Sequence, residues 1–138
     1  MHPFEQELEA NMKHIYEIAE RTFWGFLGCK VESIESGIVK ISLEAQPHHL
    51  NIIGIVHGGV LSSLLDNAMG LAVILARPDE KSVTANLNMH FVAPMSAGKL
   101  LVTAEIVHQS RRSITTSGTV TDEQGKLGAM GTGSFRII

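Results

Sequence analysis

Apolar residues recur every three or four positions in the N-terminal segment, at Phe4, Leu8, Met12, Ile15, Ala19 and Phe23. Residues at this spacing share one face of an amphipathic helix. Pro3 stands close to the start of the run, a position that proline tolerates in a helix. The pattern predicts one amphipathic helix that reaches Phe23.

The next segment changes to a two-residue period. The apolar residues Val39, Ile41, Leu43 and Ala45 alternate with polar ones, as expected for a strand that is buried on one face. Glu35-Ser36-Gly37 precedes this run and indicates a hairpin turn. Two strands are therefore predicted after the first helix.

The segment 57–76 is apolar on nearly every face. Only a few polar residues interrupt it, among them Ser62, Ser63, Asp66 and Asn67. A helix of this kind is expected to be buried on most sides. The longest apolar region, 60–76, is broken by these residues and is expected to fall short of a membrane span.

Four further strands are predicted in the C-terminal half. The first alternates apolar residues at 83, 85, 87, 89 and 91 with polar residues that include Thr84. The others cover 100–108, 113–121 and 127–138, and short polar turns at 109–112 and 122–125 separate them. This order of elements predicts an α+β domain in which an antiparallel sheet curls around the central helix.

Composition and charge narrow the range of functions. The 138 residues suit one domain over 1–138, which we expect to comprise an N-terminal helix at 1–24 and a core at 25–138. A net charge of −3 offers no basic surplus for nucleic acid. No secretory signal is evident, so we expect a cytoplasmic protein without a membrane partner. The single cysteine, Cys29, excludes an intramolecular disulfide and is expected to be buried.

Small and polar residues form a stripe on the central helix. Steps of three or four residues lead from Gly59 to either Ser62 or Ser63, from either serine to Asp66, and from Asp66 to Gly70, so these residues share one face. A carboxylate in so apolar a helix must be hydrogen-bonded, paired or protonated. The residues alone leave two interpretations of Asp66 open, a structural contact between subunits and a catalytic acid.

The start of this helix is rich in glycine. His57-Gly58-Gly59 precedes the apolar run and follows Asn51 and Gly54 in the preceding loop. Glycines let a ligand approach the backbone, and the N–H groups at a helix N-terminus favour an anion. Such a terminus suits the oxyanion of an attacked thioester carbonyl, and it equally suits tight packing against a strand.

Together these residues resemble a known family. The stretch Asn51-(x)2-Gly54-(x)2-His57-Gly58-Gly59-(x)6-Asp66-Asn67 is similar to the hotdog-fold thioesterases of the phenylacetate-degradation type, within the 4-hydroxybenzoyl-CoA thioesterase superfamily. The similarity spans residues 25–138 and includes Ser82-Val83-Thr84 and the turn at Arg111-Arg112. The resemblance implies a hotdog fold and hydrolysis of an acyl-CoA or acyl-carrier thioester to a free acid and a thiol.

The resemblance also implies roles for individual residues. Asp66 corresponds to the catalytic acid, which acts as a nucleophile or as a general base on water. The backbone N–H of Gly58 corresponds to the group that polarises the thioester carbonyl. Asn51 and His57 correspond to groups that orient the water, the carbonyl or the leaving sulfur, and Thr84 to one that positions the water.

Four further residues are expected to bind substrate. Gly59 and Ser63 lie close to the helix start, and Arg111 and Arg112 form a basic turn. Arginine suits the phosphates of coenzyme A, although solvated charges at a turn are a common alternative. No cofactor is expected, because coenzyme A is part of the substrate.

The spacing of the motif requires two subunits. His57 and Asp66 are nine residues apart, so on one helix they are separated by about 13 to 14 Å at ~1.5 Å per residue. One chain cannot therefore bring Asp66 to a carbonyl held at Gly58. Two antiparallel helices would place each acid near the helix start of the other subunit. We expect a homo-oligomer, a dimer at least, with a dimer of dimers as the expected assembly.

Other chemistries fit the sequence less well. His48, His49 and His57 lack the spacing of a zinc site, so no metal is expected, and no GxSxG serine-hydrolase motif is present. A hotdog dehydratase or hydratase for β-hydroxyacyl thioesters would also use a histidine before the helix and an acid within it. A non-catalytic acyl-CoA-binding module is a third possibility. The glycines after His57 and the preceding Asn51 favour the thioesterase, but they do not specify the acyl group.

Overall fold

A computed structural model describes the chain from Pro3 to Ile138, with side chains from Ala10 onward except that of Asn11. The helices are α1 (Pro3–Ala19), α2 (Phe23–Leu27) and α3 (Gly58–Ala76), with a short 3-10 helix, η1, at Pro47–His49. The strands are β1 (Lys30–Glu35), β2 (Ile38–Ala45), β3 (Ser82–Phe91), β4 (Gly98–Gln109), β5 (Ser113–Asp122) and β6 (Leu127–Ile137).

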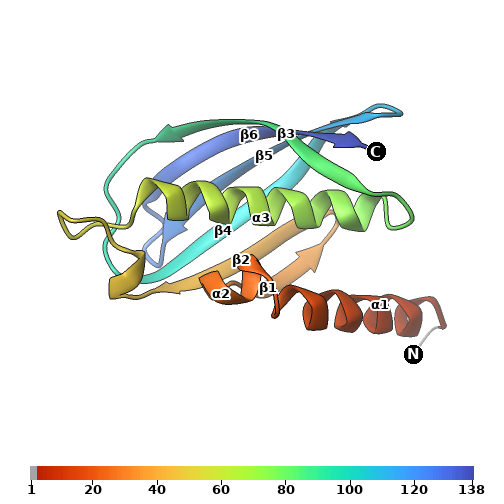
Figure 1. Cartoon of the computed structure of the whole chain (residues 1–138), viewed down its shortest axis with the longest axis horizontal. Helices are drawn as coiled ribbons and strands as arrows, with labels where there is room; N and C mark the ends of the chain where they lie inside the picture. The colour runs from red at the N-terminus through yellow and green to blue at the C-terminus, as the bar shows by residue number, and fades with distance from the viewer. Residues whose placement is uncertain (1–2) are drawn as a thin grey trace.

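The strands form one antiparallel sheet in the order β1-β2-β4-β5-β6-β3. The long helix α3 lies across one face of this sheet, as Figure 1 shows. The hairpin turn predicted before β2 is present, because Ser36 and Gly37 both have a positive φ, of 51° and 78°. The structure confirms the predicted α+β class and the hotdog arrangement, with β1 and β3 at the edges of the sheet.

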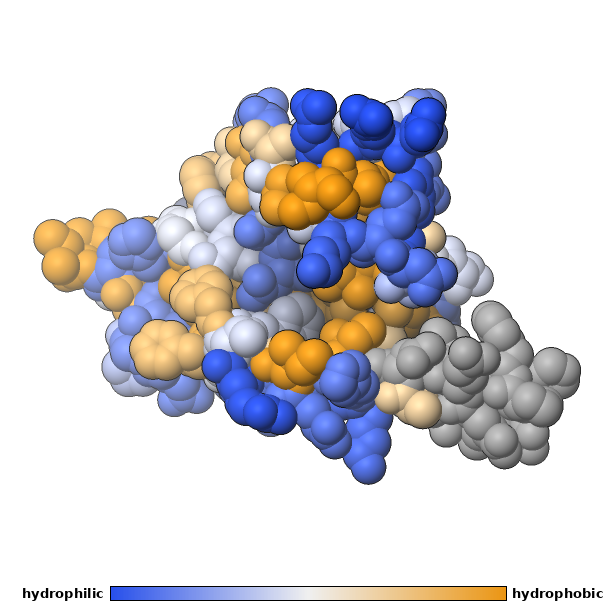
Figure 2. Space-filling view, turned by 45° about the vertical axis from the view of Figure 1, so that its right-hand side comes forward, coloured by the Kyte–Doolittle hydropathy of each residue, from blue (hydrophilic) through white to orange (hydrophobic). Residues whose placement is uncertain are grey.

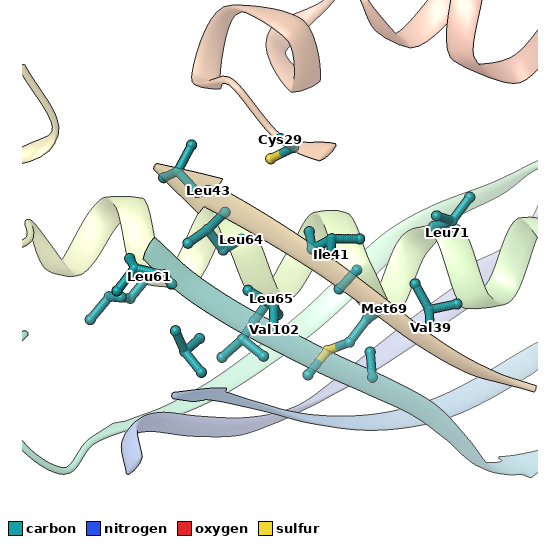
Figure 3. Close-up of a cluster of buried hydrophobic side chains, with 14 of the residues drawn as sticks. Cys29, Val39, Ile41, Leu43, Leu61, Leu64, Leu65, Met69, Leu71 and Val102 are labelled. Atoms are coloured by element: carbon teal, nitrogen blue, oxygen red, sulfur yellow. The ribbon is translucent and has the colours of Figure 1, made fainter. Parts of the chain in front are cut away.

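The hydrophobic core lies between α3 and the sheet (Figure 3). Leu64, Leu65 and Met69 on the helix have no exposed surface, and they pack with buried residues of β2 and β4. Glycines in the sheet allow α3 to approach it closely. A Cβ at Gly118 would come within 2.7 Å of Leu65 Cδ2, and one at Gly133 within 2.9 Å of Met69 Sδ. Each large side chain that is fully buried here stabilises the fold by about 1.5–3 kcal/mol.

The opposite face of α3 is not covered by the chain itself. Gly59 and Ile74 are exposed, and Ser62, Asp66 and Gly70 are half-buried. The prediction of a helix buried on most sides is therefore wrong for this stripe, since one sheet covers only one face of a helix.

By length and composition, α3 is apolar enough to cross a membrane, which contradicts the expectation that its polar residues leave it too short. The core helix of a soluble protein meets the same criterion. Its packing against the sheet accounts for its apolar character here, because eight of its residues are buried in the core.

The N-terminal region also differs from its prediction. Helix α1 ends at Ala19, and Phe23 belongs to the separate helix α2. The Thr22 hydroxyl donates to the Ala19 carbonyl at 2.7 Å, and at Gly25 a side chain would overlap the Glu20 carbonyl. The chain therefore bends tightly between the two helices, which a helical spacing of apolar residues cannot reveal. The predicted positions Phe4 and Leu8 lie outside the described side chains.

Candidate active site

The candidate catalytic acid is hydrogen-bonded to the edge strand β3. Asp66 is half-buried on the uncovered face of α3, and the hydroxyl of Thr84 on β3 donates to its Oδ1 at 2.8 Å. Among the described residues, no other side chain bonds to this carboxylate. The second carboxylate oxygen is therefore available to a water molecule or a substrate.

A β-bulge directs Thr84 toward the helix. Thr84 pairs with Phe135 and Leu87 pairs with Gly133, while the register shifts between Thr84 and Asn86. Regular alternation would place Thr84 and Leu87 on opposite faces, because they are three residues apart. The extra residue in the bulge brings both onto the face that meets α3. The prediction that β3 alternates without interruption is wrong at this point.

A cavity of about 570 Å³ opens beside Asp66 and Thr84. Helix α3 forms one side of it, and the N-terminal segment, the start of β3 and the C-terminal end of β6 form the others. Most of the lining is apolar and includes Ile15, Trp24, Leu71, Ile74 and Phe135. Pockets of this size and character take small organic ligands.

Asn67, the residue after the acid, also lines this cavity. Its amide nitrogen donates to Cys29 Sγ at 3.5 Å. Burial raises the pKa of the Cys29 thiol, and the hydrogen bond from Asn67 acts in the opposite direction. Cys29 is 2% exposed, so the expectation of a buried, structural cysteine is confirmed.

The other candidate residues gather at the N-terminal end of α3. His57 caps the helix, and its Nδ1 accepts a hydrogen bond from the Gly59 amide at 2.8 Å. In a neutral imidazole, Nε2 then carries the proton and can donate it. In the described part of the chain the Gly58 N–H donates to no acceptor. It stands at the positive end of a 19-residue helix dipole.

Asn51 organises the loop before this helix. Its side-chain oxygen accepts from the amides of Ile53 and Ile55 at 3.1 and 3.2 Å. This leaves the side-chain NH2 group of Asn51 without an acceptor among the described residues. The loop projects from the left-hand end of the molecule in Figure 1, and Ile52 and Ile53 at its tip are exposed.

Gly59 and Ser63 have local structural roles in a single chain. A Cβ at Gly59 would lie 2.9 Å from His57 Nδ1, so a side chain there would displace the capping ring. The Ser63 hydroxyl donates to the Gly59 carbonyl at 2.7 Å. Gly59 remains exposed on the open face of α3.

The structure thus brings the candidates together in two separate groups. Asp66 lies with Thr84, whereas His57 and Gly58 stand at the start of the helix and Asn51 lies in the loop before it. Eight residues of one helix separate Gly58 from Asp66, which amounts to about 12 Å. Within one chain these two groups do not meet.

Arg111 and Arg112 are exposed in the turn between β4 and β5. This turn lies at the C-terminal end of α3, because Arg77, the C-cap residue of the helix, donates to the carbonyls of Ser110 and Arg111. Arg136 pairs with Ser113 beside this turn and is also exposed.

The paired histidines have a structural explanation. His49 is 4% exposed, its Nε2 lies 2.8 Å from the Leu27 carbonyl, and its Nδ1 accepts from the Gln46 amide at 2.9 Å. Burial lowers the pKa of this imidazole, although the hydrogen bond to the Leu27 carbonyl opposes that effect. Within the described residues no cluster of three or more His, Cys, Asp or Glu side chains is placed to hold a metal.

Comparison with known proteins adds independent evidence. The model of the family described as the thioesterase superfamily matches residues 53–129. Human acyl-coenzyme A thioesterase 13 is 29% identical over 101 residues, which cover 72% of each chain.

Solved structures agree with this match. The phenylacetic acid degradation protein PaaI of Thermus thermophilus has 32% identity and a TM-score of 0.77, and the alignment covers 84% of this chain and 98% of that one. The PaaI protein of the phenylacetic acid degradation operon of Escherichia coli has 25% identity and a TM-score of 0.81, with 94% and 91% covered. The similarity thus extends over nearly the whole chain.

Proposed function

The chain belongs to the thioesterase superfamily and is a thioester hydrolase, and from this premise we propose that it cleaves acyl-coenzyme A to a free acid and coenzyme A. The observation that carries the proposal is the hydrogen bond of 2.8 Å between Thr84 and Asp66 at an apolar cavity. The human relative, named an acyl-coenzyme A thioesterase, supports this choice of substrate. Such a substrate is consistent with a cytoplasmic enzyme.

In the proposed reaction Asp66 acts at the carbonyl carbon of the thioester. As a general base it takes a proton from water while the water oxygen bonds to this carbon. The resulting tetrahedral intermediate collapses, the C–S bond breaks, and the proton passes to the leaving sulfur. As a nucleophile, Asp66 would instead attack the same carbon, break the C–S bond with release of the coenzyme A thiolate, which takes up a proton, and form a mixed anhydride that water then hydrolyses. Thr84 holds one carboxylate oxygen in place in both routes, and no metal or cofactor takes part.

The negative charge on the attacked oxygen requires a donor, and the Gly58 amide is the one we propose. It is unpaired within the described part of the chain and lies at a helix N-terminus, where backbone donors stabilise an oxyanion. Asn51 and His57 lie in the same group and retain donors of their own for the carbonyl or the leaving sulfur.

The separation of about 12 Å between Gly58 and Asp66 leads us to propose a site shared by two subunits. Two α3 helices packed antiparallel through their open faces would bring each Asp66 to the Gly58 of the partner subunit. The apolar side chains that are exposed in a single chain support such packing. They include Phe91 on β3, which is 56% exposed and whose ring lies next to Gly58. Figure 2 shows one face of the molecule, on which apolar residues, in orange, reach the surface.

The proposal is tested by thiol release from a panel of acyl-CoA substrates. Asp66→Ala is expected to lower turnover by several orders of magnitude and to leave a folded oligomer, since general catalysis alone gives about 10²–10⁴-fold. Asp79→Asn is the matched control, because this exposed acid does not line the cavity. If Asp66→Ala keeps more than about a tenth of the wild-type rate, its assignment as the general catalyst is wrong.

A single turnover in isotopically labelled water separates the two routes. If Asp66 is the nucleophile, water attacks the anhydride and the label can enter the Asp66 side chain. If Asp66 is a general base, the label enters only the product acid. Mass spectrometry of the peptide that contains Asp66 measures the difference.

A further inference from the structure

We propose that the cavity beside Asp66 receives the acyl group. Gly70 sets the usable width of this cavity along α3, and the N-terminal segment with Tyr16 and Trp24 closes the outer side of the cavity. The substrate class is then a thioester of an apolar acyl group. This inference rests on the proposed function, and it adds the residues that select the acyl group.

The cavity runs along the helix away from the reacting centre. Asp66, Gly70 and Ile74 all line it and follow one another at four-residue steps, so they share one stripe of α3. From Asp66 to Ile74 this stripe is about 12 Å long. An acyl group whose carbonyl lies at Asp66 can therefore extend past Gly70 toward Ile74.

Gly70 leaves space that a side chain could fill. A Cβ at this position would meet only Phe135 Cε1, at 3.7 Å, which is ordinary van der Waals contact. Glycine within a helix is about 0.5–1 kcal/mol less favourable than alanine. Packing within this chain thus does not require glycine here, whereas a side chain would project into the cavity. The open volume of the cavity explains why glycine is present at position 70, although alanine would stabilise the helix more.

The outer side comes from residues before the hotdog core. Tyr16 on α1 and Trp24 on α2 both line the cavity, and Trp24 also packs against the hydrophobic core. Burial raises the pKa of the Tyr16 phenol, in keeping with its position against the apolar wall. The family match begins only at residue 53, so this side of the cavity is built by a segment outside the matched region.

The charges in the lining favour an apolar acyl group. Apart from Asp66, the charged side chains that line the cavity are Glu80 and Lys81. Glu80 is paired with Arg77 at 3.0 Å, and both lining residues are exposed. Among the described residues, no buried cation is present to bind an acyl group that carries a carboxylate.

The experiment measures kcat/KM for a series of acyl-CoA substrates from acetyl to decanoyl, together with phenylacetyl. Gly70→Leu is expected to lower the ratio of octanoyl to acetyl hydrolysis by about tenfold or more, because one methylene in an apolar pocket changes discrimination about 10–200-fold. Gly70→Ala should shift the ratio in the same direction by less. Ala76→Leu, at an exposed helix position outside this cavity, is the control and should leave the ratio unchanged.

Trp24→Ala tests the outer wall independently. It removes one side of the cavity, so the dependence of kcat/KM on chain length should flatten. If wild-type protein hydrolyses none of the substrates, the proposed function fails. If it hydrolyses them and neither the Gly70 variants nor Trp24→Ala changes the profile, this inference is wrong while the function stands. Gly70→Ala preserves the test if Gly70→Leu does not fold.

Discussion

The hydroxyl of Thr84 donates to the carboxylate of Asp66 across 18 residues of sequence, and the β-bulge after Thr84 makes this contact possible. Without the bulge, Thr84 would share a face with Asn86 and point away from α3. The β-bulge in the edge strand β3 therefore places the Thr84 hydroxyl beside the Asp66 carboxylate in the candidate site.

Replacing Thr84 by valine is expected to lower kcat by about 10–100-fold, since a hydrogen bond to a charged group contributes about 1.5–3 kcal/mol. Valine has nearly the same shape and lacks the hydroxyl. Thr84→Ser retains the donor and should restore most of the rate. Steady-state kinetics on one acyl-CoA substrate compare the two variants. Equal rates for the valine and serine variants would show that the hydroxyl is dispensable.

The periodicities of the sequence were sufficient to predict the central helix and all six strands. These periods arise because a helix or strand is buried on one face. The alternation of the buried residues Val39, Ile41 and Leu43 therefore predicts the strand β2 directly. The clustering of His57 and Gly58 with Asn51 was also predictable, because these residues are neighbours in the chain.

Features that depend on contacts distant in sequence were not predictable in this way. The bulge at β3 has no signature in the alternation around Thr84. The break between α1 and α2 leaves the apolar spacing through Phe23 intact. The cavity requires residues of the N-terminal segment and of β6 to meet at α3, and no local pattern encodes such a meeting.

The turn at Arg111 and Arg112 is expected to contribute to binding of the coenzyme A phosphates. Joint replacement by alanine should raise KM for acyl-CoA by about tenfold and change kcat little, which is the signature of lost uniform binding. A truncated pantetheine thioester, which lacks those phosphates, should be hydrolysed almost equally by variant and wild type. Lys126→Ala, in the turn between β5 and β6, is the control. An equal effect on both substrates would assign the arginines a structural role.

His49 is expected to make the stability of the fold depend on pH. Burial lowers its pKa in the folded state below the value of about 6.5 in the unfolded chain. The neutral form is therefore favoured by folding, and its contribution is fully present above that unfolded value. As the pH falls through the folded pKa, the contribution is lost, because protonation of Nδ1 removes the acceptor of the Gln46 amide.

The measurement is Tm across mildly acidic to neutral pH for wild type and His49→Gln. The variant should be less stable at neutral pH and should lose less stability on acidification. His108→Gln, which changes an exposed histidine that does not act on the pKa of His49, is the control and should follow the wild-type curve. Parallel curves for wild type and His49→Gln would contradict the assignment.

If two subunits share each active site, mixed dimers of two inactive variants should regain activity. One of these variants can be made at the start of α3. Gly58→Pro removes the amide hydrogen that is proposed to bind the oxyanion. Proline suits the first position of a helix, and the extended conformation of His57, with φ −62° and ψ 136°, suits the residue before proline. Gly58→Ala is the matched control, because it retains the amide, and the added Cβ would lie 3.5 Å from Phe91, an ordinary contact.

Gly58→Pro and Asp66→Ala should each be inactive when pure and should regain activity when mixed. In a mixed dimer one site receives both defects and the other receives neither. With random subunit exchange, half of the dimers are mixed and half of their sites are intact, so activity should rise to about one quarter of wild type. Two different affinity tags verify that mixed dimers have formed. If verified mixed dimers are as inactive as their parents, the acid and the amide do not act across the interface, and the geometry of the proposed mechanism is wrong.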